Sequence, residues 1–199
     1  MPRRELNVST LPSVVFGHRS LIWWGTAGMM LIEGTAFAIT VAAYFYLRTR
    51  STDWPPGFMP PRLSAGTINL ALFLVSLVPN VWTQKVAQRG NLVQTRIGLV
   101  IMTLIGVGNI VIRFYEFPRL MCTWDGNAYA SATWLLLGLH TTHIITDWFD
   151  TAVLAVLFFT PHVQGRRYMD ASENADYWYF VVFTWIPIYA VIYLAPRFL

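Results

Sequence analysis

The segment GLHTTHIITDWFD, residues 138–150, decides how this chain folds, because it lies inside a long apolar stretch and still carries four ionisable side chains. They are His140, His143, Asp147 and Asp150, which follow one another at steps of 3, 4 and 3 residues. At about 100° per residue of an α-helix, these positions fall on one stripe about 80° wide. An aspartate that faces lipid at the centre of a bilayer costs roughly 2.5 to 3.5 kcal/mol. If the segment is a membrane helix, its polar stripe therefore faces protein or water.

The apolar stretch around this segment, roughly residues 130–160, has four counterparts elsewhere in the chain. They cover roughly residues 20–47, 64–84, 92–114 and 177–196. Each is long enough for a helix of about 20 residues that crosses a hydrocarbon core of about 30 Å. Only 12% of the residues are charged, whereas about 25% is typical of soluble domains. The sequence therefore predicts an all-α fold, with residues 1–199 forming a single membrane domain of five transmembrane helices.

The basic residues flank the apolar stretches, so we attribute the sequence pI of about 9.5 to anchoring at lipid headgroups and not to nucleic-acid binding. With the N-terminus in the cytoplasm, eight Lys and Arg residues lie on the inner side and six on the outer side. The positive-inside rule then predicts a cytoplasmic N-terminus and an external C-terminus. The inner set is Arg3, Arg4, Arg19, Lys85, Arg89, Arg96, Arg166 and Arg167, and the outer set is Arg48, Arg50, Arg62, Arg113, Arg119 and Arg197.

The single cysteine, Cys122, excludes an intrachain disulfide and any site built from several cysteines.

The polar stripe allows two interpretations. A single metal ion held by His140, His143 and Asp147 is geometrically possible. Two histidines on the same side of one helix cannot sandwich a haem, and no Glu-x-x-His motif of a di-metal bundle occurs in the chain. We favour a buried, hydrogen-bonded seam within a helix bundle, and we expect neither a metal ligand nor a catalytic residue in this chain.

Glu33 lies near the middle of the first apolar stretch, at a depth that His140 and His143 would share if the two helices pack together. The carboxylate and an imidazole could then satisfy one another. An intramembrane acid is equally a candidate for proton handling. Both interpretations stay open for the cluster of Glu33, His140 and His143.

Three further expectations concern single residues. Arg113 and Glu116, three positions apart at a helix end, should form a local ion pair. Asp147 should be protonated or bonded to neutral donors, of which Asn80 and Thr83 are the nearest by depth. Asp150 should lie near the inner headgroups and meet water or a basic group.

The order of several motifs resembles subunit III of the haem-copper oxidases, the cytochrome c and quinol oxidases. The resemblance runs from about residue 20 to the C-terminus, and the five-helix length is similar to the shorter bacterial form. Three departures from the family pattern stand out: Arg113 replaces a glutamine, Asp147 replaces a glycine, and Tyr179 and Val182 replace a histidine and an aspartate. The motifs are EGTAF at 33–37 with YF at 44–45, WPPG at 54–57, AGTINL at 65–70, the series Gly106, Asn109, Arg113, Glu116 and Phe117, the series Gly138, His140 and His143, and YWYFVVFTW at 177–185.

This resemblance implies a multi-pass subunit of the bacterial cytoplasmic (inner) membrane that supports the catalytic subunit I beside other oxidase subunits. Such a subunit binds phospholipid and aids proton uptake during oxygen reduction. It carries no cofactor itself, and haem and copper are expected in partner subunits. The composition agrees, because four histidines and one cysteine cannot supply a haem-copper core and a binuclear copper site.

Two other functions are considered. An accessory protein of a nitric oxide reductase system has a similar length and helix count, and the catalytic partner would distinguish it. A small transporter or channel would show internal repeats with helices interrupted at matched positions, and the sequence lacks these.

Overall fold

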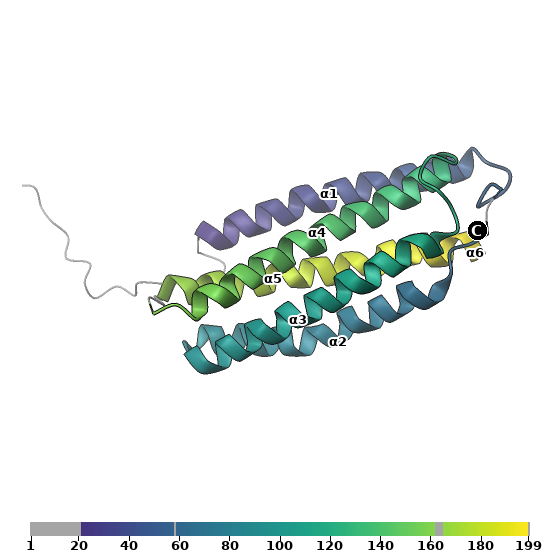
Figure 1. Ribbon diagram of the computed structural model, residues 1–199. Helices are drawn as coiled ribbons and strands as arrows, with labels where there is room; N and C mark the ends of the chain where they lie inside the picture. The colour runs from purple at the N-terminus through teal and green to yellow at the C-terminus, as the bar shows by residue number, and fades with distance from the viewer. Residues whose placement is uncertain (1–20, 58, 162–164, 199) are drawn as a thin grey trace, which may run out of the picture.

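The computed structural model describes residues 21–57, 59–161 and 165–198, and within these ranges the chain forms long helices that lie side by side, with no strand (Figure 1). Arg3, Arg4 and Arg19, on which the predicted orientation partly rests, lie outside the described residues. The elements are α1 (Leu21–Thr49), α2 (Leu63–Gln88), α3 (Leu92–Glu116), a 3₁₀ turn (Phe117–Leu120), α4 (Ala128–Phe158), α5 (Gly165–Tyr189), a π-helical turn (Ala190–Leu194) and α6 (Ala195–Phe198).

The prediction of an all-α membrane bundle is confirmed. Among the described residues, α1, α2, α3 with its 3₁₀ turn, and the helical segment Arg166–Phe198 are long and apolar enough to cross a membrane. With 31 residues, α4 has the length as well, but its two histidines and two aspartates make it more polar. Its polar side chains are tolerated because α4 packs against α1, α3 and α5.

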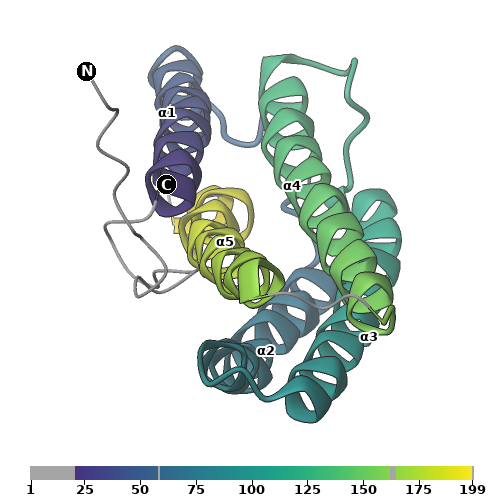
Figure 2. The ribbon, with the colours of Figure 1, turned by 90° about the vertical axis from the view of Figure 1, so that its left-hand side faces the viewer.

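In the bundle, α2 and α4 each pack against both α3 and α5, while α1 packs mainly on α4 and α5 (Figure 2). The only buried residues of α1 are Phe37 and Tyr44. These two are seven residues apart, which places them on one face of the helix. The helix α1 is therefore a peripheral element that leaves most of its apolar surface exposed.

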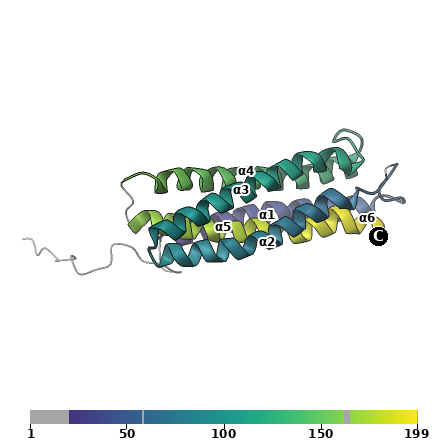
Figure 3. The same cartoon turned by 60° about the horizontal axis from the view of Figure 1, so that its bottom comes forward.

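The two ends of the bundle are distinct. The start of α1, the turn between α2 and α3, and the start of α5 lie at one end, and α6 lies at the other (Figures 1 and 3). At the α6 end, Asn127 begins α4 by accepting a hydrogen bond from the backbone N–H of Ala130 at 2.9 Å. Its amide also donates to the carbonyl of Pro56 at 2.9 Å. One side chain thus caps a helix and ties the loop after α1 to that cap.

Small residues set the contact between α3 and α4. A Cβ atom added at Gly106 would lie 2.6 Å from Cδ1 of Trp148 on α4. The indole N–H of Trp148 donates to the carbonyl of Thr103 at 3.1 Å, which holds the ring against α3. Glycine at position 106 therefore makes room for a tryptophan between two helices.

One predicted boundary is wrong by a large margin. The last long helix begins at Gly165, twelve residues before the predicted start at 177. Its first part, RRYMDASENAD at 166–176, is too polar to be recognised as an apolar stretch. That part is nevertheless helical, and Ala171 and Ala175 are buried against its neighbours. The other predicted boundaries lie within about four residues of those observed.

Candidate functional site

Two groups of side chains within the bundle each bring several ionisable residues together. We call the first the carboxylate cavity, defined by Glu33, Asp147, Asp150, Asp170 and Glu173, which line one cavity. We call the second the arginine cluster, defined by Asn69, Arg113, Glu116, His140 and Tyr193. The sequence placed His140 and His143 in one cluster with Glu33; in the structure His143 lies beside Glu33, whereas His140 belongs to the arginine cluster.

Glu33 contacts two other helices from α1. One carboxylate oxygen, Oε2, accepts a hydrogen bond from the hydroxyl of Tyr177 on α5 at 2.7 Å. The other, Oε1, lies 3.5 Å from Nε2 of His143 on α4. The ring of Phe37 packs on His143 with centroids 5.0 Å apart. Glu33 is thus the polar contact that joins α1 to α4 and α5.

The contact between Glu33 and His143 constrains where a proton lies. Nδ1 of His143 is 2.6 Å from the carbonyl of Leu139, and a carbonyl only accepts, so Nδ1 carries a hydrogen. Nε2 then faces a carboxylate oxygen, and two bare acceptors repel one another. A proton on either Nε2 or the carboxyl group would make this approach an attractive contact.

Of the two histidines that could share a depth with Glu33, His143 lies next to the carboxylate, whereas His140 faces other partners. Its Nδ1 lies 3.0 Å from a guanidinium nitrogen of Arg113, and its Nε2 lies 3.0 Å from the carbonyl of Val181. Because a guanidinium only donates, Nδ1 must accept and Nε2 must carry the hydrogen. His140 is therefore a neutral imidazole, fixed in one tautomer and stacked on Trp185 with centroids 4.9 Å apart.

Arg113 and Glu116 form an ion pair with 2.7 Å between nitrogen and oxygen. It was expected to be a local pair at a helix end, but both side chains are almost completely buried, at 1% and 0% exposure. The guanidinium lies 4.0 Å from the ring centroid of Trp185, a distance at which a cation is attracted to the ring face.

Glu116 also accepts hydrogen bonds from side chains outside α3. It accepts a hydrogen bond from Asn69 of α2 at 3.2 Å and a short one from the hydroxyl of Tyr193. Together with His140 of α4, these contacts join four helical segments around one buried charge pair. Spacing along the sequence could reveal only the pair within α3, because the other partners come from distant positions.

Asp147 is buried, at 2% exposure, and its donor is not one of those expected. Oδ1 accepts a hydrogen bond from the amide of Asn174 on α5 at 3.1 Å. Asn80 instead donates to the carbonyl of Ala175 and Thr83 to that of Pro79, so the prediction that they serve Asp147 is wrong. Asn174 was missed because it lies in the polar first part of α5, before the predicted start of that helix.

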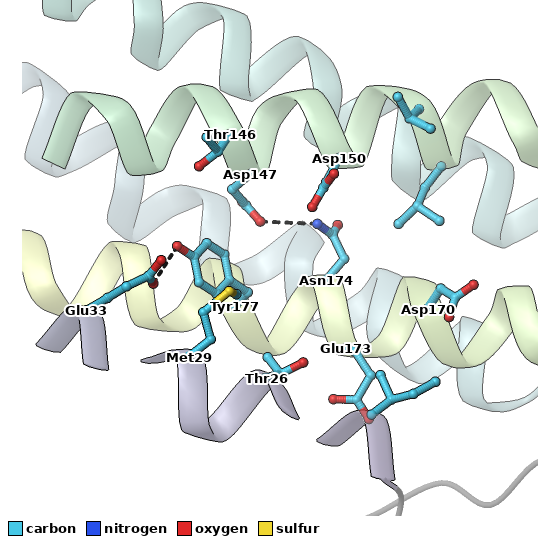
Figure 4. A pocket seen from close by; sticks show the side chains of 13 residues that line it. Thr26, Met29, Glu33, Thr146, Asp147, Asp150, Asp170, Glu173, Asn174 and Tyr177 are labelled. Atoms are coloured by element: carbon cyan, nitrogen blue, oxygen red, sulfur yellow. Dashed lines mark hydrogen bonds between the residues drawn. The ribbon is translucent and has the colours of Figure 1, made fainter. Parts of the chain in front are cut away.

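The carboxylate cavity has a volume of about 520 Å³ and lies between α1, α4 and α5 (Figure 4). Asp147 and Asp150 come from α4, Asp170 and Glu173 from α5, and Glu33 from α1. Asp150 is exposed. None of the described residues that line this cavity is a lysine, arginine or histidine. The cavity is therefore strongly acidic, and it is suited to bind protons or an organic cation.

Within residues 21–57, 59–161 and 165–198, no three His, Cys, Asp or Glu side chains lie close enough together to hold a metal ion. His143 and Asp147, which were considered as ligands with His140, bond to Leu139 and Asn174 instead.

Residues 51–196 match the protein family described as cytochrome c oxidase subunit III. Among curated proteins, the chain is 25% identical over 179 residues to cytochrome c oxidase subunit 3 of Drosophila yakuba, covering 85% of this chain and 68% of that protein. It is 28% identical over 182 residues to a probable cytochrome c oxidase subunit 3 of Mycobacterium bovis, covering 85% of each.

Proposed function

The chain belongs to the cytochrome c oxidase subunit III family, and we propose that it acts as the non-redox subunit III of a respiratory haem-copper terminal oxidase. Family membership makes it a membrane-embedded part of an oxidase complex. The finer proposal is that it supports the catalytic subunit I, binds phospholipid and aids proton uptake. Haem and copper, which perform oxygen reduction, would be held by partner subunits.

The observation that carries the proposal is the contact between Oε1 of Glu33 and Nε2 of His143, 3.5 Å apart, beside the carboxylate cavity. Proton uptake needs groups that bind a proton and release it again, close to water. Glu33 lines the cavity and is 25% exposed, so protons can reach it through that space. Tyr177 orients the carboxylate, and the Leu139 carbonyl fixes the histidine ring, so that a proton-binding oxygen and a proton-binding nitrogen face one another.

Support of a catalytic subunit requires a stiff body with an apolar surface. The arginine cluster supplies stiffness, because it joins α2, α3, α4 and the π-helical turn after α5 through buried hydrogen bonds. Exposed apolar side chains on α1, such as Leu31, Ile32 and Ile39, offer a surface for lipid or for a neighbouring helix.

We also propose that the N-terminus is cytoplasmic and that the membrane is the bacterial inner membrane. The burial of Arg113 adds to the sequence argument. Because Arg113 is paired inside the bundle, it no longer counts among the basic residues on the outer side. Five basic residues then lie on the outer side and eight on the inner side. The positive-inside rule thus favours this orientation more clearly.

Purification of the complex from its natural host, with Glu33→Ala beside wild type, tests the proposal. We expect a large haem-bearing subunit to copurify. Glu33→Ala should slow proton-coupled oxygen reduction while leaving the haem spectrum unchanged. The matched control is Asp53→Asn, which removes an exposed acid at the opposite end of the bundle and should leave turnover at the wild-type rate.

Three results would contradict the proposal. Full turnover in Glu33→Ala would remove the role in proton uptake. Stoichiometric haem on the isolated chain would show that it is not a non-redox subunit. A complex that reduces nitric oxide and not oxygen would assign the chain to the alternative accessory role.

A further inference from the structure

Asp147 is an acid in the wall of the carboxylate cavity, and only one of its two oxygens is bonded. Oδ1 accepts a hydrogen bond from the amide of Asn174 at 3.1 Å, and the hydroxyl of Thr151 donates to the carbonyl oxygen of the same Asn174 side chain at 2.9 Å. Oδ2 of Asp147 has no hydrogen-bond partner among the described residues, although the residue is only 2% exposed. A buried carboxylate oxygen is costly in this state unless a proton or a water molecule serves it.

The cavity is the side from which Oδ2 can be reached, because Asp147 lines it. Asp147 and Asp150 both point from α4 toward α5 there (Figure 4). No lysine, arginine or histidine is among the described residues that line the cavity, so an ion pair does not explain the acid. An asparagine at position 147 could accept the bond from Asn174 equally well. Binding and releasing a proton is what the carboxyl group adds at this position.

Three ionisable residues of α4 follow one another toward the end of the bundle that we propose to be cytoplasmic. Because α4 begins at the α6 end, His143, Asp147 and Asp150 lie successively nearer to that cytoplasmic end. Their steps of four and three residues correspond to about 6 Å and about 4.5 Å along the helix axis. Asp150 is exposed, Asp147 is buried, and Nε2 of His143 lies 3.5 Å from Oε1 of Glu33. The series therefore runs from the exposed end of the cavity to the proposed site of proton uptake.

Water in the cavity can bridge the steps of this series. Carboxyl groups one helical turn apart are separated by more than one hydrogen-bond length, so a proton needs water between them. The cavity has a volume of about 520 Å³, and a water molecule takes about 30 Å³ in the liquid. Its lining includes the polar side chains of Asp170, Glu173 and Tyr177, which can hold such water. The space between α1, α4 and α5 is therefore large and polar enough for a hydrogen-bonded path.

We propose that Asp147 is a proton-relay residue for the site formed by Glu33 and His143. A proton from water at the Asp150 end of the cavity binds Oδ2 of Asp147, which becomes a neutral carboxylic acid. Asp147 then gives a proton, through water in the cavity, to Oε1 of Glu33 or Nε2 of His143 and returns to its carboxylate form. Only O–H and N–H bonds form and break. This inference rests on the proposed role in proton uptake, and it names the acid that supplies that site.

The test follows oxygen consumption by the purified complex from neutral to alkaline pH. Where protons are scarce, uptake without the relay should limit turnover, so Asp147→Asn should lose activity at a lower pH than wild type. At the alkaline end we expect a loss on the order of tenfold, below the range typical of an acid that acts in the chemical step, because water alone still carries protons. Asp147→Glu keeps the acid and should recover most of the rate. Asp125→Asn, which removes an exposed acid at the opposite end, is the control and should match wild type.

The groups whose charge acts on Asp147 in this pH range come from each helix around the cavity. All of them stay in place in Asp147→Asn and Asp147→Glu, so the comparison isolates position 147. They are Glu33 of α1, His143 and Asp150 of α4, and Asp170, Glu173 and Tyr177 of α5, with Arg166 and Arg167 within electrostatic reach of Asp170.

A double variant tests whether Asp147 acts through Glu33. If the two residues act in series, the double variant Glu33→Ala, Asp147→Asn should be no slower than Glu33→Ala alone. If Asp147→Asn does not assemble with the haem-bearing subunit, Asp150→Asn replaces it, because that exposed side chain can change without a change in packing. It should show a smaller alkaline loss, and wild-type alkaline activity of Asp150→Asn would then overturn the inference.

Three results with assembled Asp147→Asn would overturn the relay. Wild-type activity at every pH, beside a slow Glu33→Ala, would do so and leave the proposed function intact. An equal loss at every pH would indicate a packing defect in place of a relay. Losses that multiply in the double variant would place Asp147 on a route separate from Glu33. Wild-type activity of both Glu33→Ala and Asp147→Asn would overturn the role in proton uptake itself.

Discussion

Replacing Glu116 with glutamine would leave the guanidinium of Arg113 buried without its counter-charge. Both side chains are almost fully buried, so water cannot replace the lost carboxylate. Breaking a buried pair by removing one partner typically costs about 3–5 kcal/mol. Here the guanidinium keeps its contacts to His140 and Trp185. The expected loss is therefore at the low end, about 3 kcal/mol.

The double variant Arg113→Gln, Glu116→Gln removes both charges and should lose much less stability. Replacement of a whole buried ion pair by neutral groups is often nearly neutral. The amide oxygen at position 116 can still accept from the hydroxyl of Tyr193. We therefore expect the double variant to remain within about 1 kcal/mol of wild type, well above the single variant Glu116→Gln.

Thermal unfolding of the purified complex in detergent, followed through the helical signal, measures the difference. For a chain of this size, 1 kcal/mol changes the Tm by about 2–4 °C, so Glu116→Gln should lower the Tm by about 6–12 °C. The double variant should recover most of that loss. The single variants Arg113→Gln and Glu116→Gln each have their own loss of Tm. If the double variant lost as much as these two losses added together, the charges would not compensate one another, and the reasoning would be refuted.

Four other predictions concern packing, topology, thiol reactivity and capping. Gly106→Ala should destabilise the bundle by about 1–3 kcal/mol through overpacking, because the new Cβ meets Trp148 at 2.6 Å. Gly25→Ala is the control, because nothing lies within 4 Å of a Cβ added there. Equal Tm values for the two variants would contradict the contact with Trp148. Cys122 follows the 3₁₀ turn at the α6 end, so a membrane-impermeant maleimide should label it from outside intact cells; labelling only after permeabilisation would reverse the proposed orientation. Burial raises the pKa of this thiol, so its reactive thiolate should be scarcer than in an ordinary cysteine at neutral pH, and labelling should accelerate as the pH rises toward the raised pKa. Asn127→Ala should cost about 1 kcal/mol through the lost cap, measured by thermal unfolding, whereas Asn127→Asp should keep the cap and most of the stability.

The sequence predicted the bundle well because hydrophobic length is a local property. The composition of each apolar stretch is enough to predict that the stretch lies in the membrane, whatever it packs against. The start of α5 escaped detection for the same reason: the segment 166–176 is polar, and its helical state depends on burial of Ala171 and Ala175 against other helices. Asn174, which donates to Asp147, was missed together with that segment.

The polar sites were less predictable, because their partners are set by packing angles between helices. The stripe on α4 correctly indicated residues that avoid lipid, since His140, His143 and Asp147 are buried. Spacing could not tell which neighbour each residue meets. His140 is turned toward Arg113 and His143 toward Glu33, although the two histidines are only one helical turn apart.

The peripheral position of α1 has a consequence for how the chain is made. During synthesis α1 is the first of the long helices to leave the ribosome, but its partners α4 and α5 come last, and the contact from Tyr177 to Glu33 spans 144 residues. The first helix must therefore remain in the bilayer as an independent segment while more than half of the chain is still being inserted. Its largely apolar surface suits it to the bilayer, and its central carboxylate meets His143 only once α4 has been made and Tyr177 only once α5 has been made. A chain interrupted before α4 would leave Glu33 without either of these two partners.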